Sequence, residues 1–464
     1  MLAGEPVGAV TSAVDVDPPG PKGLPYFGCL NSLLRNPMDF WTRIAVRYGG
    51  IARVPLKRKH VYLVSDPALL YELLVTNRRK YRKNTRYKAA VDTFGDGLLL
   101  TEGEAWSRQR KLTQPTFKAD YIEQQVPATA ALIDKFLDRW QPWAEQGRTF
   151  DAEEEFLRLS QRLAGHYLMG SGFETIEEQF CAAAVAIKDN WPLPPRNLAA
   201  LLVPKSKRRE QRLNTAVAAI DSCLFGYLAE HRKQDFENCG VLGVIAAGSR
   251  AQGDEWSDRS LRDQLLTLFF AGHETSAVTL TWLHYWLWRH PEVRRKLQKE
   301  VDEMLGCRRP TAEDLHKLAY TERVINETLR LDSPIHSISR VALEDDVVGG
   351  YRIPRGATIY VSLCATHRLP QLWPKPYEFD PDRFLPERCA ARPRFAFIPF
   401  AAGHRNCIGG SMAVIDLKLA VAQLAQRYVL DVAPGHRVVR VAGTTMHPRY
   451  GMKMIVRPAN ASTS

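Results

Sequence analysis

The sequence of 464 residues lacks paired cysteines. Its eight cysteines are scattered along the chain, and no two of them stand in a Cys-x-x-Cys pair. This pattern indicates neither a disulfide framework nor a zinc site, and it suits a reducing compartment. Low-complexity linkers and internal repeats are also missing, so composition does not divide the chain into domains.

The N-terminus lacks a membrane anchor. Residues 1–21 contain no lysine or arginine, and Glu5, Asp15 and Asp17 interrupt every apolar run. A signal peptide needs a positive start and an apolar core, and a spanning helix needs about 20 apolar residues. We therefore expect a cytoplasmic protein without a transmembrane anchor.

Positive charge exceeds negative charge, and the formal net charge is +12. Such an excess predicts an acidic protein partner, a nucleic acid or an anionic membrane. The sequence has no basic–aromatic stripe and no base-reading motif, so nucleic acid is the least favoured of these partners. Hydrophobic residues make up 45% of the chain, which is enough for a large core.

One short segment near the C-terminus, PFAAGHRNCIG, combines several chemically informative residues. Cys407 precedes a predicted helix, whose free N–H groups and dipole favour the thiolate. Gly403 and Gly409 allow a flat ligand to approach the backbone closely, because neither has a Cβ. Phe400 can stack beside such a ligand, and Arg405 adds a fixed positive charge two residues before the sulfur.

This segment resembles the haem-ligand loop of the cytochrome P-450 family, F-x-x-G-x-R-x-C-x-G, at every fixed position. The resemblance implies that Cys407 is the thiolate ligand of a haem iron, an arrangement that favours O–O cleavage. Without this context a lone cysteine is more often a small buried hydrophobe. Ala401 stands where the family often has glycine, and we expect it to alter the turn slightly.

Further stretches resemble motifs of the same family in the same order. A predicted helix over 104–112 places Trp106 and Arg110 on one face. Their W-x-x-x-R spacing resembles the pair that binds a haem propionate, although alone it would be an ordinary helix edge. Arg340 resembles a second propionate ligand, and Arg405 a third.

A predicted long helix over 260–288 contains the sequence AGHETS. Glycine inside a helix costs about 1 kcal/mol relative to alanine, and small Ala271 and Gly272 would let a haem approach the backbone. The stretch resembles the family's A-G-x-D/E-T-S/T. The resemblance implies that Thr275 organises water at the oxygen site and that Glu274 relays protons. Thr275 can alternatively donate to the carbonyl of Ala271.

Glu327 and Arg330 match the E-x-x-R motif of the family. The spacing recurs elsewhere in the chain, but only this pair follows the long helix and precedes a Pro-Asp-Arg-Phe segment. The resemblance implies a buried triad with Arg383, which locks the architecture because it is satisfied only when complete. Leu369 departs from the family, which has an aspartate there.

The candidates for the substrate pocket are apolar, and plain core is their alternative role. They are Phe94, Leu98, Phe270, Ile335, Ile338 and Met446. An apolar loop over 191–203 resembles the mobile roof of the substrate channel, and contact with a membrane surface is its alternative role.

Together these stretches predict a mainly α, single-domain P-450 fold with a small β region over residues 18–464, after a disordered N-terminus over 1–17. The resemblance implies a haem b monooxygenase that inserts one atom of dioxygen into an apolar lipid, terpenoid, steroid or polyketide. The acid–alcohol pair of Glu274 and Thr275 argues against a peroxygenase or isomerase, and a non-catalytic haem sensor is the other alternative.

Only 57 residues follow Cys407, which leaves no room for a fused reductase. We therefore expect electrons to pass from NAD(P)H through a separate ferredoxin or flavodoxin with its reductase. The positive net charge suits docking of such an acidic partner on the Cys407 side. We expect the protein to be a monomer.

Overall fold

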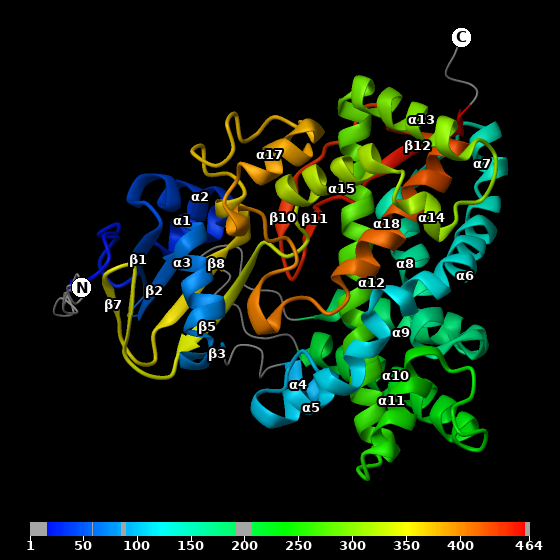
Figure 1. Cartoon of the computed structure of the whole chain (residues 1–464), viewed down its shortest axis with the longest axis horizontal. Helices are drawn as coiled ribbons and strands as arrows, with labels where there is room; N and C mark the ends of the chain where they lie inside the picture. The colour runs from blue at the N-terminus through cyan, green and yellow to red at the C-terminus, as the bar shows by residue number, and fades with distance from the viewer. Residues whose placement is uncertain (1–15, 58, 85–89, 192–206, 460–464) are drawn as a thin grey trace, which may run out of the picture.

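The computed structural model describes residues 16–57, 59–84, 90–191 and 207–459. Helices fill one half of the molecule, and a smaller half contains the N-terminal strands (Figure 1). The prediction of a mainly α fold with a small β region is confirmed. Within the described ranges, none of the helices combines the length and the apolar character that a membrane crossing requires.

The long predicted helix is present as α12 (Asp258–Arg289), which crosses the helical half (Figure 1). Ser257 caps it, because its hydroxyl accepts the N–H of Ser260. The helix packs against α8 (Ala152–Met169), where Phe156 stacks on His284 with 4.9 Å between the ring centroids. These two helices form the centre of the largest apolar core.

The remaining helices of the helical half surround this centre. They are α4 (Val91–Phe94), α5 (Gly103–Thr113), α6 (Ala119–Asp138), α7 (Gln141–Glu145), α9 (Glu177–Asn190), α10 (Lys207–Arg232), α11 (Gly240–Ala251), α13 (Pro291–Leu305), α14 (Ala312–Leu315), α15 (Ala319–Leu331) and α18 (Gly410–Arg427). Five shorter helices pack near the strands. They are α1 (Leu30–Arg35), α2 (Pro37–Tyr48), α3 (Pro67–Tyr71), α16 (Leu363–Thr366) and α17 (Pro386–Ala390).

The helix α6 ends close to Trp140, and a new helix begins directly after it. The chain leaves the helix after Asp138 and starts α7 at Gln141. Between them Trp140 is fully buried and donates its indole N–H to Glu155 at 3.0 Å. Pro142 then starts the new helix, since it lacks the N–H that a continuous helix would use.

The largest sheet has five strands in the order β1-β2-β8-β5-β3. Its first two strands form a hairpin, with β1 (Ile51–Leu56) antiparallel to β2 (Lys59–Val64). The other members are β8 (Thr358–Ser362), β5 (Ser337–Ala342) and β3 (Tyr81–Lys83). This sheet matters for the site because it sets Lys83 opposite Arg340 on neighbouring strands.

Three smaller sheets complete the fold. β4 (Thr149–Asp151), β12 (Lys453–Pro458) and β9 (Tyr428–Val432) form one, β10 (Arg440–Ala442) and β11 (Met446–Pro448) form the second, and β6 (Asp346–Val348) and β7 (Tyr351–Ile353) form the third. The hairpin of β10 and β11 carries its tip toward α12, where the indole N–H of Trp282 donates to the Met446 carbonyl at 2.8 Å.

The predicted disordered N-terminus falls mostly on residues 1–15, which lie outside the described residues. The structure describes the last two residues of this range, Val16 and Asp17. The Val16 carbonyl accepts the N–H of Arg352 at 3.1 Å, and Asp17 pairs with Arg53 at 2.9 Å. The predicted roof loop over 191–203 also lies outside the described residues, except for Trp191.

Candidate active site

The Cys407 loop is a tight turn in front of α18. The N–H of Cys407 donates to the Phe400 carbonyl at 2.9 Å, and Gly409 is the N-cap of the helix. Gly403 has a φ of 75°, and a Cβ there would lie 2.1 Å from the carbonyl oxygen of Leu74. Glycine is therefore required at 403 by both conformation and space. At Gly409 an added Cβ would meet protein only at ordinary contact distance.

The Cys407 side chain is exposed, and yet the protein around it affects the pKa of its thiol. Burial raises the pKa of the thiol, against the opposing effects of the Gly409 N–H and Arg110. The expectation of a lowered pKa was therefore wrong for the protein alone, because desolvation exceeds the helix-terminus effect. A side chain that is exposed but surrounded by protein faces a hollow within the molecule.

A hollow of about 440 Å³ does reach Cys407. Arg110 and Lys118 line it, and no carboxylate belongs to the described residues around it. Arg110 donates to the backbone carbonyl of Asn406 at 3.0 Å and to its side-chain oxygen at 3.1 Å. The sequence interpretation missed Asn406, although its place beside Cys407 was a usable signal.

Arg405 is almost fully buried at its side chain, 4% exposed. Its guanidinium lies 4.0 Å from the ring of Trp106 and pairs with Glu102 at 2.6 Å. One nitrogen, Nη1, is buried without a hydrogen-bond partner among the described residues. An orphaned guanidinium nitrogen of this kind indicates a place for an additional acceptor.

Two further cations lie next to Arg405. Lys83 stands opposite Arg340 in the β3–β5 ladder, and its ammonium donates to the Leu99 carbonyl. Burial and the charges of Arg405 and Arg340 lower the pKa of Lys83 to about 7. The same crowding lowers the pKa of Arg405. Sequence reasoning did not single out Lys83, because only the strand register brings it to Arg340.

The middle of α12 opens on one side. Ala271 and Gly272 are exposed, although most of the helix is buried. The hydroxyl of Thr275 donates to the Ala271 carbonyl at 3.0 Å, which is the alternative bond anticipated from the sequence. Glu274 accepts a hydrogen bond from the Thr445 hydroxyl at 2.7 Å. A small exposed surface and a positioned acid therefore occur on adjacent turns.

The predicted pocket residues divide into two groups. Phe94 and Phe270 are half-buried and pack edge to face at 5.0 Å, while Trp191 lies 5.1 Å from Phe94. Ile335 and Ile338 are also half-buried.

Leu98 and Met446 are more buried than these four. Leu98 is 6% exposed and Met446 is fully buried. For Met446 the reason is that its backbone joins the hairpin to the rest of the protein. Its carbonyl accepts from Trp282, and its N–H donates to Pro334.

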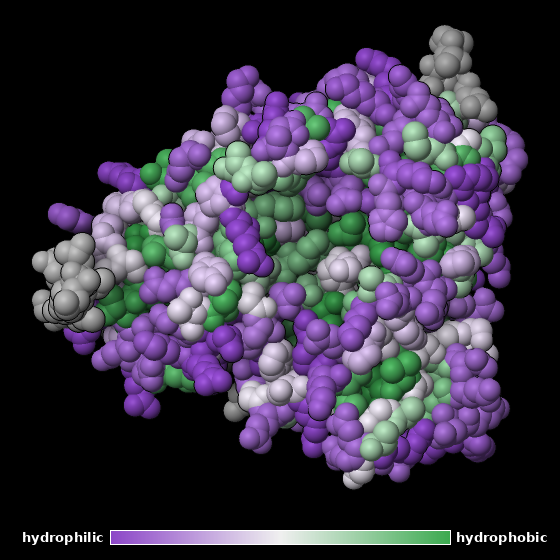
Figure 2. Space-filling view, in the orientation of Figure 1, coloured by the Kyte–Doolittle hydropathy of each residue, from purple (hydrophilic) through white to green (hydrophobic). Residues whose placement is uncertain are grey.

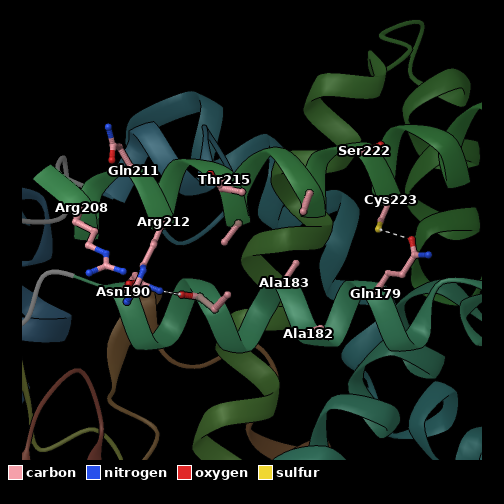
Figure 3. Close-up of a pocket in the computed structure, with 13 residues that line it drawn as sticks. Gln179, Ala182, Ala183, Asn190, Arg208, Gln211, Arg212, Thr215, Ser222 and Cys223 are labelled. Atoms are coloured by element: carbon pink, nitrogen blue, oxygen red, sulfur yellow. Dashed lines mark hydrogen bonds between the residues drawn. The ribbon is translucent and has the colours of Figure 1, made fainter.

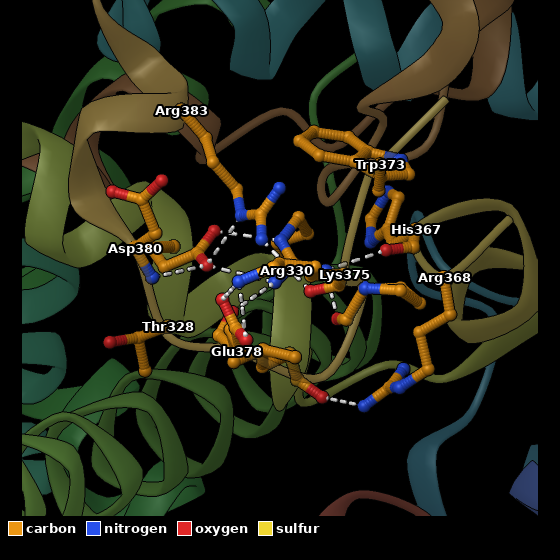
Figure 4. A network of polar contacts seen from close by, with 12 residues as sticks. Thr328, Arg330, His367, Arg368, Trp373, Lys375, Glu378, Asp380 and Arg383 are labelled. Atoms are coloured by element: carbon orange, nitrogen blue, oxygen red, sulfur yellow. Dashed lines mark hydrogen bonds and ion pairs between the residues drawn. The ribbon is translucent and has the colours of Figure 1, made fainter. Parts of the chain in front are cut away.

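Glu327, Arg330 and Arg383 come together in the core (Figure 4). Glu327 and Arg330 are both 0% exposed and form two hydrogen bonds of 2.7 and 2.8 Å. Arg383 approaches the same carboxylate at 3.3 Å. Arg330 also donates to three backbone carbonyls, at positions 367, 376 and 378, so its charge is fully hydrogen-bonded. Leu369, the departure from the family, packs in an apolar cluster and is 2% exposed.

These features fit a flat, thiolate-bound haem with two carboxylates. Cys407 faces a hollow, three crowded cations include an orphaned nitrogen, and Ala271 and Gly272 leave one stretch of α12 uncovered. Carboxylates would relieve the repulsion among Lys83, Arg340 and Arg405. An iron-bound cysteine is deprotonated by the metal, whatever its pKa in the protein alone.

Comparisons with known proteins agree with this geometry. The cytochrome P450 family model matches residues 18–455. Putative cytochrome P450 132 of Mycobacterium tuberculosis is 32% identical over 432 residues, which cover 89% of this chain and 91% of the relative. Cyclooctat-9-en-7-ol 5-monooxygenase of Streptomyces melanosporofaciens is 31% identical, with 92% and 94% coverage. Pentalenene oxygenase of Streptomyces avermitilis is 29% identical, with 92% and 95% coverage.

The fold is shared with solved structures. The crystal structure of cytochrome P450DA heme domain superimposes with a TM-score of 0.85 at 24% identity, covering 97% of this chain and 100% of that one. The family model spans nearly all of the described chain, and relatives that carry oxygenase names match along almost their whole length. The protein therefore belongs to the cytochrome P450 family and is a monooxygenase of that family.

Proposed function

We propose that this monooxygenase hydroxylates an apolar terpenoid hydrocarbon. The observation that carries the proposal is the aromatic wall of Phe94, Phe270 and Trp191, which adjoins Ala271 on α12. Such a wall recognises shape and apolar surface, and it offers no charge to anchor a carboxylate. Two relatives are named for pentalenene and cyclooctat-9-en-7-ol, an alkene and an alkenol. Lipids, steroids and polyketides are therefore less favoured substrates.

Haem b would supply the oxygen chemistry when bound, with Cys407 as its thiolate ligand. Lys83, Arg340 and Arg405 would hold its carboxylates, and Trp106 fixes the guanidinium plane of Arg405 by stacking. Arg110 holds the Cys407 loop through Asn406. These residues position the group, so they act before any chemistry begins.

Glu274 would relay protons to the oxygen site, and Thr275 would organise water there. In this structure the Thr275 hydroxyl bonds to Ala271, and a rotation about χ1 frees it for water or oxygen. Thr445 holds the Glu274 carboxylate in place while leaving it close to the exposed stretch of the helix. A positioned acid beside an alcohol typically contributes about 10²–10⁴-fold to such proton transfers.

Electrons reach the site from a separate acidic ferredoxin or flavodoxin. The hollow that reaches Cys407 is lined by Arg110 and Lys118 without a carboxylate among its described lining residues, which suits an acidic partner. Charge reversal by Lys118→Glu should slow reduction by a ferredoxin and weaken its dependence on salt. Stopped-flow reduction at two ionic strengths measures this effect, and unchanged rates would exclude this face.

A cytoplasmic location is supported by the cysteines. All eight lie in the described part of the chain, and every one is a free thiol. Free thiols in this number suit a reducing compartment. Labelling of the protein in cells with thiol reagents before lysis would test this location.

The substrate proposal is tested by optical titration of the ferric protein. A bound substrate displaces the iron-bound water and shifts the spin state from low to high. Sesquiterpene and diterpene alkenes should produce this shift, while palmitate should not. A shift with palmitate alone would overturn the terpenoid proposal and indicate a carboxylate anchor.

A further inference from the structure

A second hollow lies on the outside of the helical half, between α9 and α10 (Figure 3). It measures about 880 Å³, which is within the usual range of small-molecule sites. Its lining comes entirely from the two helices. The residues are Gln179, Ala182, Ala183, Ala186, Asn190, Arg208, Gln211, Arg212, Thr215, Ala216, Ala219, Ser222 and Cys223. None of the predicted haem or substrate residues belongs to this set.

The floor of this α9–α10 groove is apolar because facing positions carry alanine. Ala183 and Ala216 are buried, whereas Ala182 and Ala219 are exposed. Short side chains on both helices leave the hollow between them (Figure 3). Figure 2 shows an apolar patch bordered by hydrophilic residues at the lower right, near the place where Figure 1 labels α10 and α11. The outer surface of this part of the helical half is therefore not uniformly hydrophilic.

One end of the groove is positively charged. Arg208 and Arg212 extend from α10 toward the α9 side near Asn190 (Figure 3). Neither arginine has an ion-pair or hydrogen-bond partner among the described residues, and no carboxylate lines the groove there. Asn190 donates to the Ala186 carbonyl at 2.8 Å, and its neutral amide carries no charge to offset theirs. Arg208 and Arg212 are both exposed, and together they offer two guanidinium groups to an anionic ligand.

The groove is long and narrow. From Arg212 to Cys223 the α10 wall runs about 17 Å at 1.5 Å per residue. The far end is closed by Cys223, whose thiol lies 3.9 Å from the Gln179 oxygen. The charged end, the apolar floor and the length together match a carboxylate at the head of a linear acyl chain. A nucleotide or a sugar would need polar partners along the floor, where alanine stands.

We propose that the α9–α10 groove binds a long-chain fatty acid, with its carboxylate on Arg208 and Arg212 and its acyl chain over the alanine floor toward Cys223. This site is additional to the substrate pocket and does not depend on the proposed terpenoid substrate. The occupant is the free fatty acid, and the other candidate occupant is a second copy of this chain.

The thiol of Cys223 gives a readout located in the groove. The haem-loaded protein is treated with N-ethylmaleimide, with and without palmitate below its micelle concentration, and each cysteine is followed by peptide mass spectrometry. Burial raises the pKa of Cys223, so labelling is done at alkaline pH. Cys307 and Cys389 are exposed elsewhere and serve as internal controls. Palmitate should slow labelling of Cys223 and leave both controls unchanged.

Charge and shape are tested separately with variants. The double change Arg208→Gln with Arg212→Gln should raise the palmitate concentration for half-protection about tenfold or more. Hexadecanol lacks the carboxylate, so it should protect the wild type as weakly as palmitate protects the double variant. Ala219→Phe should fill the groove and abolish protection by palmitate. Lys207→Gln, which removes a neighbouring exposed charge outside the groove, should leave protection unchanged. The Soret spectrum of each variant shows whether it has folded around haem.

Three results would overturn the proposal. The first is Cys223 labelling that palmitate leaves unchanged, and the second is equal protection by palmitate in the double glutamine variant. Protection that grows with protein concentration in the absence of palmitate, together with a dimer in analytical ultracentrifugation, would assign the groove to a second copy. The spin-state titration with terpenes is independent of all three results, so failure here is distinguishable from failure of the proposed substrate.

Discussion

The hydroxyl of Thr445 donates to the carboxylate of Glu274 at 2.7 Å, across 171 residues of sequence. Thr445 is 4% exposed and lies at the tip of the β10–β11 hairpin, whereas Glu274 lies in the middle of α12. The hairpin therefore does more than close the fold, because it fixes the orientation of the acid beside Thr275.

Replacement of Thr445 by valine should uncouple the enzyme. The change keeps the shape of the side chain but removes the donor, so Glu274 loses its fixed orientation. The expected result is several-fold less product per NADPH with more peroxide, and about 1–2 kcal/mol less stability. Product and peroxide are measured together with the terpene that gives the spin shift.

Thr281→Val is the matched control for this prediction. Thr281 is buried on the same helix and donates only to the Ala277 carbonyl, so its loss should not alter coupling. Equal uncoupling in both variants would mean that the effect comes from packing of α12 and not from Glu274.

Replacement of Ala401 by glycine should stabilise the protein by about 1 kcal/mol. Ala401 adopts a φ of 56°, a left-handed conformation that costs a residue with a Cβ. Urea unfolding followed by circular dichroism measures the gain. Gly403→Ala is the opposite change in the same turn and should be strongly destabilising, since its Cβ would collide with Leu74. A loss of stability in Ala401→Gly would contradict this account of the turn.

Replacement of Glu327 by glutamine should cost about 3–5 kcal/mol and reduce haem incorporation, because two buried arginines would lose their counter-charge. The absorbance ratio of haem to protein and the unfolding midpoint are the measurements. Glu303→Gln breaks an exposed pair with Lys299 and should change stability by less than about 0.5 kcal/mol. Similar losses in both variants would show that burial of the triad is not the cause.

The contribution of His284 to the stability of the protein should fall as the pH drops from 6.5 toward 4. Burial lowers the pKa of His284 from 6.5 to about 4. Between these values the unfolded chain binds a proton that the folded chain does not, so stability increases with pH in this window. The contribution lost below pH 4 is up to about 3 kcal/mol.

His284→Phe should reduce the slope of the unfolding free energy against pH. The slope should not vanish, because burial lowers the pKa of His273 in the same way. Unfolding free energies at several pH values measure the slope. A variant with the slope of the wild type would show that His284 does not titrate in this range.

Local sequence patterns predicted much of the fold. The helices predicted over 104–112 and 260–288 depend on neighbours in the sequence, and the structure contains them as α5 and α12. The Cys407 loop could be predicted for the same reason, because its residues are neighbours in the sequence.

Contacts between segments that are distant in the sequence could not be predicted from local patterns. The approach of Lys83 to Arg340 depends on strand register, and the Thr445–Glu274 bond depends on how a hairpin packs against a helix. Met446 looked like a pocket residue because it is apolar and near the hairpin tip, but packing buries it fully. Desolvation by the surrounding protein raises the pKa of the Cys407 thiol. The position of Cys407 before a helix does not reveal this effect.

The most direct test of the account is the absorption spectrum of the reduced, carbon monoxide-bound protein and of its Cys407→His variant. With Cys407 as the thiolate ligand, the wild type should show the strongly red-shifted Soret band of thiolate ligation. The variant should show the band of an imidazole-ligated haem, or no haem at all. A wild-type spectrum that persists unchanged in Cys407→His would contradict the assignment of Cys407 and, with it, the proposed chemistry.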